Sequence, residues 1–463
     1  MGHKCFSVQL VVMLWLIASI AFAQTSSSAK LDNSFDQFVL DALKEAKTPG
    51  AAIAIVQGDK IVFAKGYGVT SVEFPAPITP DTLFRLGSTT KMFTAAALVQ
   101  LAEEGKLRLD APIGTYVRGL SPRLAKTTLH QLLSHTAGLR DFAATVKSND
   151  DDALAKMIRA WKDDVFYGEP GRIYSYSSAG YWLAGLVLEE VAKQPYAEAM
   201  KAQLFRPLGM ERTSLRPLEA LTYPLAIGHK LESNRPVIIR PAFNNNAMWP
   251  AGSMYSSVNE LSRSAIAFLN AGLLDGKQTL PANVITKLST KHIKMPFDEN
   301  EGHGYGLMVN RYRGIPMVSH GGFSTGYGSM IYMAPEHRVA VIVLTNKSGE
   351  TLQKVGQKAL NLFLPVGTAD TQSTNEAKPI TEAELKEAPG KYLHAPQTFE
   401  VFARNQQLLL RQEQKEFTLK KIGPFAFLYG EGQESFIVFV PSKAGQVEYA
   451  FDGMYAYRKG AKK

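Results

Sequence analysis

The sequence predicts an α+β fold in which β-rich segments near both ends of a long region flank a helical middle. Two β-rich runs, 51–57 and 61–66, are separated by Gly58-Asp59, a pair typical of a hairpin turn. Three further runs of the same kind follow much later: 316–320, 327–333 and 339–344. The two groups form either two separate sheets or one sheet into which the helices are inserted.

Helical spacing of apolar residues dominates the region between these two groups. A first helix over 35–46 is stopped by Thr48-Pro49-Gly50, and a last helix over 350–363 follows the final strand. Five helices are expected between them: 88–104, 128–134, 152–161, 178–193 and 257–271. Pro and Gly residues stand in the gaps, as is typical of helix ends and loops.

The C-terminal part predicts a second, smaller β domain. Residues 367–379 are polar and lack apolar periodicity, so they are expected to form a linker. Residues 380–463 then carry short β-rich runs separated by turn residues: 398–403, 407–411, 417–422, 425–429, 435–440, 447–451 and 455–458. This pattern predicts a small antiparallel barrel or sandwich. No acid–base group stands out there, which favours a structural role through stability or through subunit contacts in a homo-oligomer.

The first 23 residues have the pattern of a secretory signal peptide. Lys4 precedes an apolar run over 8–22, and Ala21-Phe22-Ala23 offers a small-residue cleavage site before Gln24. The alternative is an uncleaved membrane anchor, although the run is short for a span and polar residues follow it directly. We therefore expect an exported protein, periplasmic or secreted. Its mature chain would lack Cys5, the only cysteine, and so would have no disulfide.

The composition is that of a globular protein with an excess of positive charge. The chain has 463 residues, 45% hydrophobic and 20% charged, and its formal net charge is +9. It has no stripe of Arg and Lys with interleaved aromatic residues, so the charge does not indicate nucleic-acid binding. Zinc-ligand spacing, a Walker loop and a dinucleotide fingerprint are also missing from the sequence, so no metal or cofactor is expected.

The most informative feature is a serine and a lysine three positions apart, Ser88 and Lys91, where an apolar helix begins. Three residues is nearly one helical turn, so both side chains lie on the same face and can meet. A serine hydroxyl needs a base to become a good nucleophile, and a buried, neutral lysine can supply one. The spacing alone is weak evidence, because Ser before a helix is also an ordinary N-cap.

The surrounding sequence resembles the β-lactamase-related serine hydrolases, which include class C β-lactamases, D-Ala-D-Ala carboxypeptidases, D-aminopeptidases and lactamase-like esterases. Several segments match that family in order: Phe84-Arg85-Leu86-Gly87-Ser88-Thr89-Thr90-Lys91, Leu132-Leu133-Ser134-His135-Thr136-Ala137-Gly138-Leu139, Tyr176-Ser177-Ser178, Trp249-Pro250-Ala251-Gly252, Gly304-Tyr305-Gly306 and Ser319-His320-Gly321-Gly322. The resemblance covers about residues 35–365.

The resemblance implies one antiparallel sheet built from both ends of a catalytic domain over residues 30–366, with a helical subdomain inserted. It thereby selects the one-sheet arrangement from the two left open above. The C-terminal domain is similar to the lipocalin-like appendage that some members carry.

By the resemblance, Ser88 is the nucleophile, and Lys91 and Tyr176 handle its proton. Lysine has an ordinary pKa of about 10.4, so a base role for Lys91 needs a depressed pKa. Tyr176 matches the family's Tyr-x-Asn element, with Tyr174 and Tyr181 as nearby alternatives. Whether Lys91 or Tyr176 accepts the proton stays open at this point.

Two positions around the expected site depart from the family pattern. Ser178 stands where the family usually has Asn, and serine is shorter and offers one hydroxyl. His320-Gly321-Gly322 stands where many members have Lys-Thr-Gly, so a fixed cation and a hydroxyl are missing. These residues, with Phe323, are the expected substrate-binding group, and the Phe323 amide is expected to complete an oxyanion hole with the Ser88 amide.

Two residues near these motifs, Ser324 and His135, are not expected to be catalytic. Ser324 lies in Gly322-Phe323-Ser324-Thr325-Gly326, which fits a nucleophile elbow, but that motif requires a following helix and a β-pattern follows here. His135 is expected to bond the backbone at a turn.

The expected function is an exported serine hydrolase that cleaves an ester or amide through an acyl-enzyme on Ser88. Its substrate would be a β-lactam, a D-amino-acid peptide or a short acyl ester, with the latter two favoured by the departures described above. The alternative is a non-catalytic envelope protein that binds peptidoglycan-like peptides in the same groove.

Overall fold

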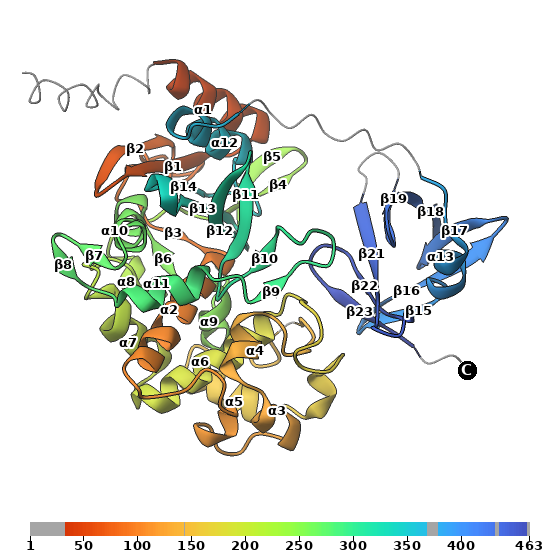
Figure 1. Ribbon diagram of the computed structural model, residues 1–463. Helices are drawn as coiled ribbons and strands as arrows, with labels where there is room; N and C mark the ends of the chain where they lie inside the picture. The colour runs from red at the N-terminus through yellow and green to blue at the C-terminus, as the bar shows by residue number, and fades with distance from the viewer. Residues whose placement is uncertain (1–32, 143, 368–377, 431–434, 461–463) are drawn as a thin grey trace, which may run out of the picture.

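The structure is a computed structural model that describes residues 33–142, 144–367, 378–430 and 435–460 (Figure 1). The expected signal peptide, residues 1–23, lies outside the described residues, as do residues 368–377 of the expected linker, 367–379. Within the described part of the chain, no helix is long and apolar enough to cross a membrane.

The central element is an antiparallel sheet of eight strands in the order β2-β1-β14-β13-β12-β11-β10-β9. Strand β1 (Gly50–Gln57) pairs with β14 (Val339–Thr345) from Ala51–Thr345 to Gln57–Val339. The prediction of one sheet made from both ends of the domain is therefore confirmed. Its other strands are β2 (Lys60–Gly68), β9 (Ile293–Lys294), β10 (Gly302–His303), β11 (Met308–Tyr312), β12 (Ile315–Ser324) and β13 (Tyr327–Ala334).

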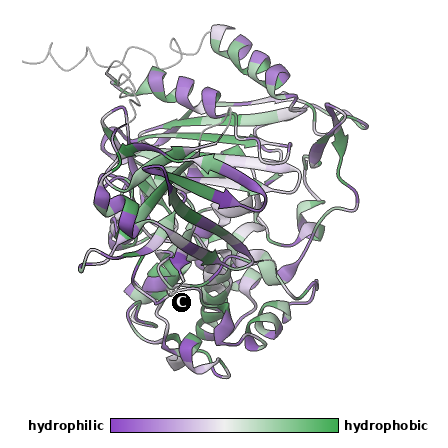
Figure 2. Ribbon diagram, turned by 90° about the vertical axis from the view of Figure 1, so that its right-hand side faces the viewer, coloured by the Kyte–Doolittle hydropathy of each residue, from purple (hydrophilic) through white to green (hydrophobic). Residues whose placement is uncertain are grey.

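Both faces of this sheet are covered, which explains why β1 and β14 read as continuous apolar runs. In β1, Ala52 and Ala54 face one core and Ile53 and Ile55 face another, following the two-residue period of a strand. Helices α1 (Asn33–Ala46) and α12 (Gln353–Phe363) cover the second face (Figure 1). Figure 2 shows hydrophobic residues gathered along the strands of the sheet.

The first face carries the helical subdomain, which was expected from the resemblance. Helix α2 (Thr90–Glu103) runs through its centre and buries most of its residues. The helices around it are α3 (Pro122–Lys126), α4 (Leu129–Leu133), α5 (Ala153–Arg159), α6 (Ser178–Ala192), α7 (Tyr196–Met200), α8 (Pro217–Ala220), α9 (Trp249–Gly252), α10 (Val258–Leu269) and α11 (Ala282–Ser289). Three small two-stranded pairs complete the domain: β3 (Phe84–Arg85) with β6 (Tyr255–Ser256), β4 (His229–Glu232) with β5 (Arg235–Ile238), and β7 (Leu273–Leu274) with β8 (Lys277–Gln278).

The C-terminal domain is a nearly closed antiparallel barrel of nine strands, with β18 and β19 at the two ends of the strand order. After α13 (Glu382–Glu387) come β15 (Gly390–His394), β16 (Gln397–Arg404), β17 (Gln407–Gln412), β18 (Lys415–Thr418), β19 (Lys420–Gly423), β20 (Ala426–Tyr429), β21 (Ser435–Pro441), β22 (Val447–Phe451) and β23 (Ala456–Lys459). The barrel prediction is confirmed with two more strands than expected. Strand β15 was missed, and the run 417–422 divides into β18 and β19 around Leu419. The lipocalin likeness stays a prediction.

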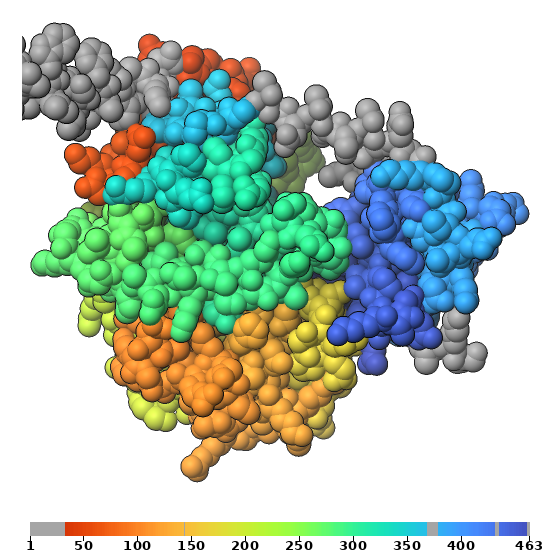
Figure 3. All heavy atoms as spheres, viewed as in Figure 1, coloured from red at the N-terminus to blue at the C-terminus, as the bar shows by residue number. Residues whose placement is uncertain are grey.

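The barrel lies against the catalytic domain beside the β9–β10 region and the segment before α6 (Figure 3). A shared apolar cluster joins the two domains, with Ile173, Tyr174 and Tyr176 on one side and Tyr449 and Phe451 on the other. Aromatic rings contact each other across the junction, since Tyr174 packs edge-on against Phe451 with ring centroids 6.0 Å apart. The barrel therefore contacts the segment that carries the candidate catalytic tyrosine.

Candidate active site

Ser88 lies in a single 3₁₀ turn, Gly87–Thr89, which leads directly into α2. Gly87 has a positive φ of 55°, and a side chain there would meet the Phe323 backbone oxygen at 2.6 Å. Glycine is therefore required at position 87, because it allows both this backbone conformation and the close approach of β12. The local sequence thus places the serine between the start of a buried helix and the edge of a strand.

Lys91 is fully buried and points its amino group at Ser88. Its Nζ lies 3.1 Å from Ser88 Oγ and donates a hydrogen bond to the Ala251 carbonyl oxygen at 2.7 Å. Burial lowers the pKa of Lys91 to about 7, while the charge of Asp141 raises it in part. A substantial fraction of Lys91 is therefore neutral near neutral pH and able to accept a proton.

Tyr176 completes the group, as its ring lies over Lys91 with Nζ 4.8 Å from the ring centroid. Burial raises the pKa of Tyr176 well above its ordinary value, and a hydrogen bond with the Ser88 side chain offsets part of this rise. The two neighbouring tyrosines are engaged elsewhere, since the Tyr181 hydroxyl donates to the Leu133 carbonyl and Tyr174 packs against Phe451. Tyr176 is thus a protonated phenol beside the serine.

His135 packs against Tyr176 and lies at a turn, where the φ angle of His135 is +56°. Its Nδ1 accepts a hydrogen bond from the Ser177 amide at 3.0 Å, as expected for a histidine that bonds the backbone. Its ring also stacks on the Tyr176 ring with centroids 4.5 Å apart. Burial holds the pKa of His135 well below its usual range, so the ring stays neutral.

The second half of β12 forms the opposite side of the site. Residues 320–324 pair with β13, whereas the pairing with β11 ends at Ser319. One edge of this segment is therefore free of a strand partner among the described residues, and it faces the 3₁₀ turn of Ser88. A side chain at Gly322 would meet the Leu86 carbonyl oxygen at 1.8 Å, so glycine is needed for this approach as well.

His320 is buried, and its Nδ1 lies 2.7 Å from the Gly321 carbonyl oxygen. Burial first, and then the charges of Lys91 and His303, lower the pKa of His320 to about 3. The ring is therefore neutral at ordinary pH and cannot replace the family's fixed cation. Neither His320 nor Gly322 lines the cleft at Ser88, whereas Ser88, Ser178 and Phe323 do.

The cleft at Ser88 has a volume of about 460 Å³, within the ordinary range for small-molecule sites. Its remaining walls are formed by residues from both sides of the domain: Arg85, Trp182, Phe243, Met248, Ala251, Gly252, Ser324, Thr325 and Ser348. Ser324 therefore reaches the cleft, but it ends β12 and is followed by a turn and β13. That arrangement excludes a nucleophile elbow, which needs a helix at this point.

Two charged residues at the site were missed by sequence reasoning. Arg85 is buried in the cleft wall, donates to the Phe243 carbonyl and Ser253 hydroxyl, and has no carboxylate partner in the described ranges. Asp141 accepts a hydrogen bond from the Ser178 amide at 2.7 Å. A charge inside the apolar run before Ser88 was the available signal for Arg85. Asp141 lies in a loop with no periodic pattern.

No group of three His, Cys, Asp or Glu side chains in the described parts of the chain could hold a metal ion. The groups gathered at Ser88 are the serine itself, a lysine with a lowered pKa, a protonated tyrosine and backbone amides.

Comparison with known proteins agrees with this class of site. The Beta-lactamase family profile matches residues 35–362, so the chain belongs to the Beta-lactamase family of serine hydrolases. Penicillin-binding protein 4 of Amycolatopsis lactamdurans is 30% identical over 328 residues, which are 68% of this chain and 85% of that protein.

Two further proteins extend the comparison. Protein flp of Staphylococcus aureus (strain N315) is 27% identical over 69% of this chain, and the match spans only 64% of that longer protein. The octameric penicillin-binding protein homologue from Pyrococcus abyssi has a TM-score of 0.64 and 26% identity, covering 92% of this chain and 99% of its own. The structural likeness thus includes most of the C-terminal domain as well.

Proposed function

We propose that the protein hydrolyses esters or amides through an acyl-enzyme on Ser88. The observation that carries this proposal is the 3.1 Å separation between Lys91 Nζ and Ser88 Oγ, at the end of a lysine side chain that is fully buried. A base must lie within hydrogen-bond reach of the proton that it removes and needs a pKa near the working pH. Lys91 meets both conditions, because its pKa is lowered to about 7.

In the proposed first step, neutral Lys91 accepts the Ser88 proton while Oγ attacks the substrate carbonyl carbon. The carbonyl oxygen gains negative charge and is bound by the backbone amides of Ser88 and Phe323. Collapse of this intermediate expels the leaving group, which takes a proton from the Tyr176 hydroxyl, and Lys91 returns a proton to Tyr176. Water then attacks the acyl-enzyme with the same residues acting in reverse.

Short acyl esters and D-amino-acid amides fit this site better than β-lactams. Lys-Thr-Gly offers a cation and a hydroxyl suited to a substrate carboxylate, whereas His320 is neutral and buried and Gly321 has no side chain. Ser178 offers one hydroxyl where an amide could bind a peptide group from two sides. The substrates would therefore be recognised mainly by their acyl group within the 460 Å³ cleft.

A substrate panel tests the proposal. It consists of p-nitrophenyl esters of increasing acyl length, D-amino-acid p-nitroanilides, a D-Ala-D-Ala peptide and nitrocefin. We expect turnover of an ester or anilide that falls at least about 1000-fold in Ser88→Ala and by less than about tenfold in Ser324→Ala, which alters only the wall of the cleft. Binding of a fluorescent penicillin without turnover of any of these substrates would instead support the alternative, a non-catalytic binder of peptidoglycan-like peptides.

We also propose that the protein is exported and that residues 1–23 are removed. The signal-like pattern of that segment supports this proposal. N-terminal sequencing of the protein recovered outside the cytoplasm should begin at Gln24. An intact Met1 on the exported protein would indicate a retained anchor, and a wholly cytoplasmic protein would contradict export.

A homo-oligomer formed through the C-terminal barrel is the third part of the proposal. It is supported by the octameric assembly of the Pyrococcus abyssi homologue, which resembles this chain over 92% of its length. Light scattering of the full chain should give a mass that is a multiple of the protomer mass. A monomer at all concentrations would contradict it.

A further inference from the structure

The barrel reaches the candidate active site through the turn between β22 and β23, residues 452–455. The Met454 carbonyl oxygen accepts a hydrogen bond from the Tyr176 amide at 2.9 Å. The Ala456 amide, at the start of β23, donates to the Ser175 hydroxyl at 3.0 Å. The barrel therefore bonds both Tyr176 and the residue before it.

A second link runs from the same turn to the wall of the cleft. The Tyr455 hydroxyl donates to Asp141 Oδ2 at 3.2 Å, and Asp141 Oδ1 accepts from the Ser178 amide at 2.7 Å. The Asp141 amide also donates to Nε2 of His394, a barrel residue, at 3.3 Å. Asp141 is thus held between the barrel on one side and the first residue of α6 on the other.

Hydrogen bonds within the barrel itself hold the turn in its conformation. Asp452 Oδ1 accepts hydrogen bonds from the amides of Met454 and Tyr455, at 2.9 and 2.7 Å. Asp452 Oδ2 accepts from the Tyr457 hydroxyl at 3.0 Å. These bonds fix the direction of the Met454 carbonyl and the Tyr455 ring without help from the catalytic domain.

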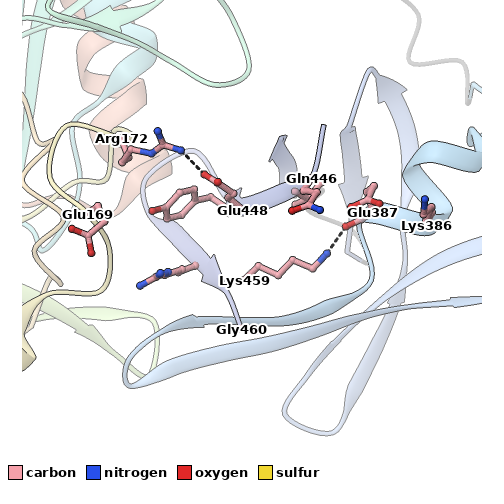
Figure 4. A pocket seen from close by; sticks show the side chains of 11 residues that line it. Glu169, Arg172, Lys386, Glu387, Gln446, Glu448, Lys459 and Gly460 are labelled. Atoms are coloured by element: carbon pink, nitrogen blue, oxygen red, sulfur yellow. Dashed lines mark hydrogen bonds and ion pairs between the residues drawn. The ribbon is translucent and has the colours of Figure 1, made fainter. Parts of the chain in front are cut away.

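Further contacts hold the barrel in place beside the turn. A cavity of about 720 Å³ lies at the junction, and in its lining Arg172 pairs with Glu448 at a distance of 2.7 Å. Figure 4 shows this pair among the side chains that line the cavity. Arg172 stands four residues before Tyr176, so this ion pair acts on the same segment. Phe297, near β9, packs against Phe436 with ring centroids 5.0 Å apart. The docked position of the turn therefore rests on several contacts.

Loss of the turn would disturb the catalytic geometry. The Tyr176 amide would lose its partner in a buried setting, which costs free energy unless the segment moves to find another. Any such movement displaces the Tyr176 hydroxyl relative to Ser88. Proton transfer needs the donor and the acceptor within hydrogen-bond distance, so its rate falls when the hydroxyl moves away. The bond from Asp141 to Ser178 would weaken in the same event.

We propose that Tyr455 is a positioning residue of the active site, and that the β22–β23 turn holds Tyr176 and the Asp141–Ser178 pair in register with Ser88. The barrel is on this account a part of the catalytic unit as well as a structural appendage. The proposal rests on the proposed function, in which Tyr176 gives a proton to the leaving group.

The test uses a series of substituted phenyl esters that share one acyl group turned over by the wild type. A good leaving group such as p-nitrophenolate needs little protonation, whereas phenol and p-methylphenol need more. A badly placed Tyr176 therefore slows the poor leaving groups most. We expect Tyr455→Phe to lower kcat/KM about tenfold for the phenyl ester and at most twofold for the p-nitrophenyl ester. Ser175→Ala should likewise lower kcat/KM more for the phenyl ester than for the p-nitrophenyl ester.

Tyr392→Phe is the matched control, because it removes another barrel hydroxyl, one that donates to the Ala388 carbonyl within the barrel. Its rates should fall by the same factor for all esters, if they fall at all. An equal factor across the series in Tyr455→Phe, or no change, would overturn the positioning role while leaving the proposed function intact. A wild type without Ser88-dependent turnover would instead overturn the proposed function.

Discussion

The amino group of Lys91 lies 3.1 Å from the Ser88 hydroxyl, at the end of a side chain with no solvent exposure. Burial lowers the pKa of His135, His303 and His320 nearby, so these rings are neutral and add no cation at ordinary pH. Lys91 is therefore the group near Ser88 whose charge changes around neutral pH.

The rate of acylation should rise with pH through the pKa of Lys91. Lys91 accepts the serine proton only when neutral, and burial lowers its pKa to about 7. The value of kcat/KM for an ester should therefore be about tenfold lower at pH 6 than on the plateau above pH 8. A stopped assay across pH 5.5–9 measures this rise of kcat/KM with pH, the acid limb of the profile. A profile that is flat from pH 5.5 to 9 would contradict a base of this kind.

Asp141→Asn should move that limb toward lower pH. The negative charge of Asp141 raises the pKa of Lys91, so removing the charge lets the pKa fall further. We expect a shift of a few tenths to about one pH unit, measured with the same ester. Asp163→Asn is the control, because its carboxylate bonds Ser121 at the surface and should leave the limb unchanged. If kcat/KM of Asp141→Asn instead rose at a higher pH than in the wild type, the claim that Asp141 raises the pKa of Lys91 would be wrong.

Gly322→Ala should separate β12 from the turn that carries Ser88. A methyl group there would meet the Leu86 carbonyl oxygen at 1.8 Å, which forces the backbone to move. Overpacking of this kind costs about 1–3 kcal/mol or more, and we expect a lower Tm together with the loss of Ser88 labelling.

The neighbouring Gly321→Ala provides the control for that variant. Its methyl group would lie 3.2 Å from the sulfur of the flexible Met330 side chain and 3.9 Å from the Ser329 carbonyl oxygen, which is ordinary contact. Thermal unfolding of the two variants should therefore differ, with the larger loss in Gly322→Ala. Equal losses of stability and labelling would mean that the strand is not held closely against the turn.

Ser178→Asn should increase the reactivity of Ser88 toward penicillins. Ser178 lines the cleft, and an Asn amide adds a donor and an acceptor that reach further toward a substrate amide. One added hydrogen bond corresponds to about twofold to tenfold in the labelling rate with a fluorescent penicillin. Hydrolysis of a short ester should stay within twofold. A variant that loses both activities would show that position 178 matters for folding or for the catalytic geometry.

The strands of the sheet and the Ser88–Lys91 pair carry local signals, whereas the single sheet was predicted only through the resemblance of the surrounding segments. The β-rich run 339–344 indicated a strand, which the structure shows as Val339–Thr345, and the spacing of Ser88 and Lys91 predicted that both side chains lie on one helical face. The short strands β9 to β11 were missed, since two to five residues carry too little periodicity.

The remaining parts of the site depend on contacts between distant segments. Tyr455 bonds Asp141 across 314 positions, and neither residue stands in a recognisable pattern. The low pKa of His320 could not be foreseen either, because it depends on burial and on the charges of Lys91 and His303. Sequence reasoning therefore pointed to the Ser88–Lys91 pair, which the structure brings together, but not to the barrel turn that contacts Tyr176.

Labelling with a serine-reactive fluorophosphonate, followed by mass spectrometry of the peptides, tests the central claim most directly. The account predicts one phosphonyl adduct on Ser88 in the folded wild type, at a similar rate in Ser324→Ala. It also predicts no adduct in Ser88→Ala, with circular dichroism confirming that this variant is folded. An adduct on Ser324, or no adduct on any serine of the folded protein, would contradict it.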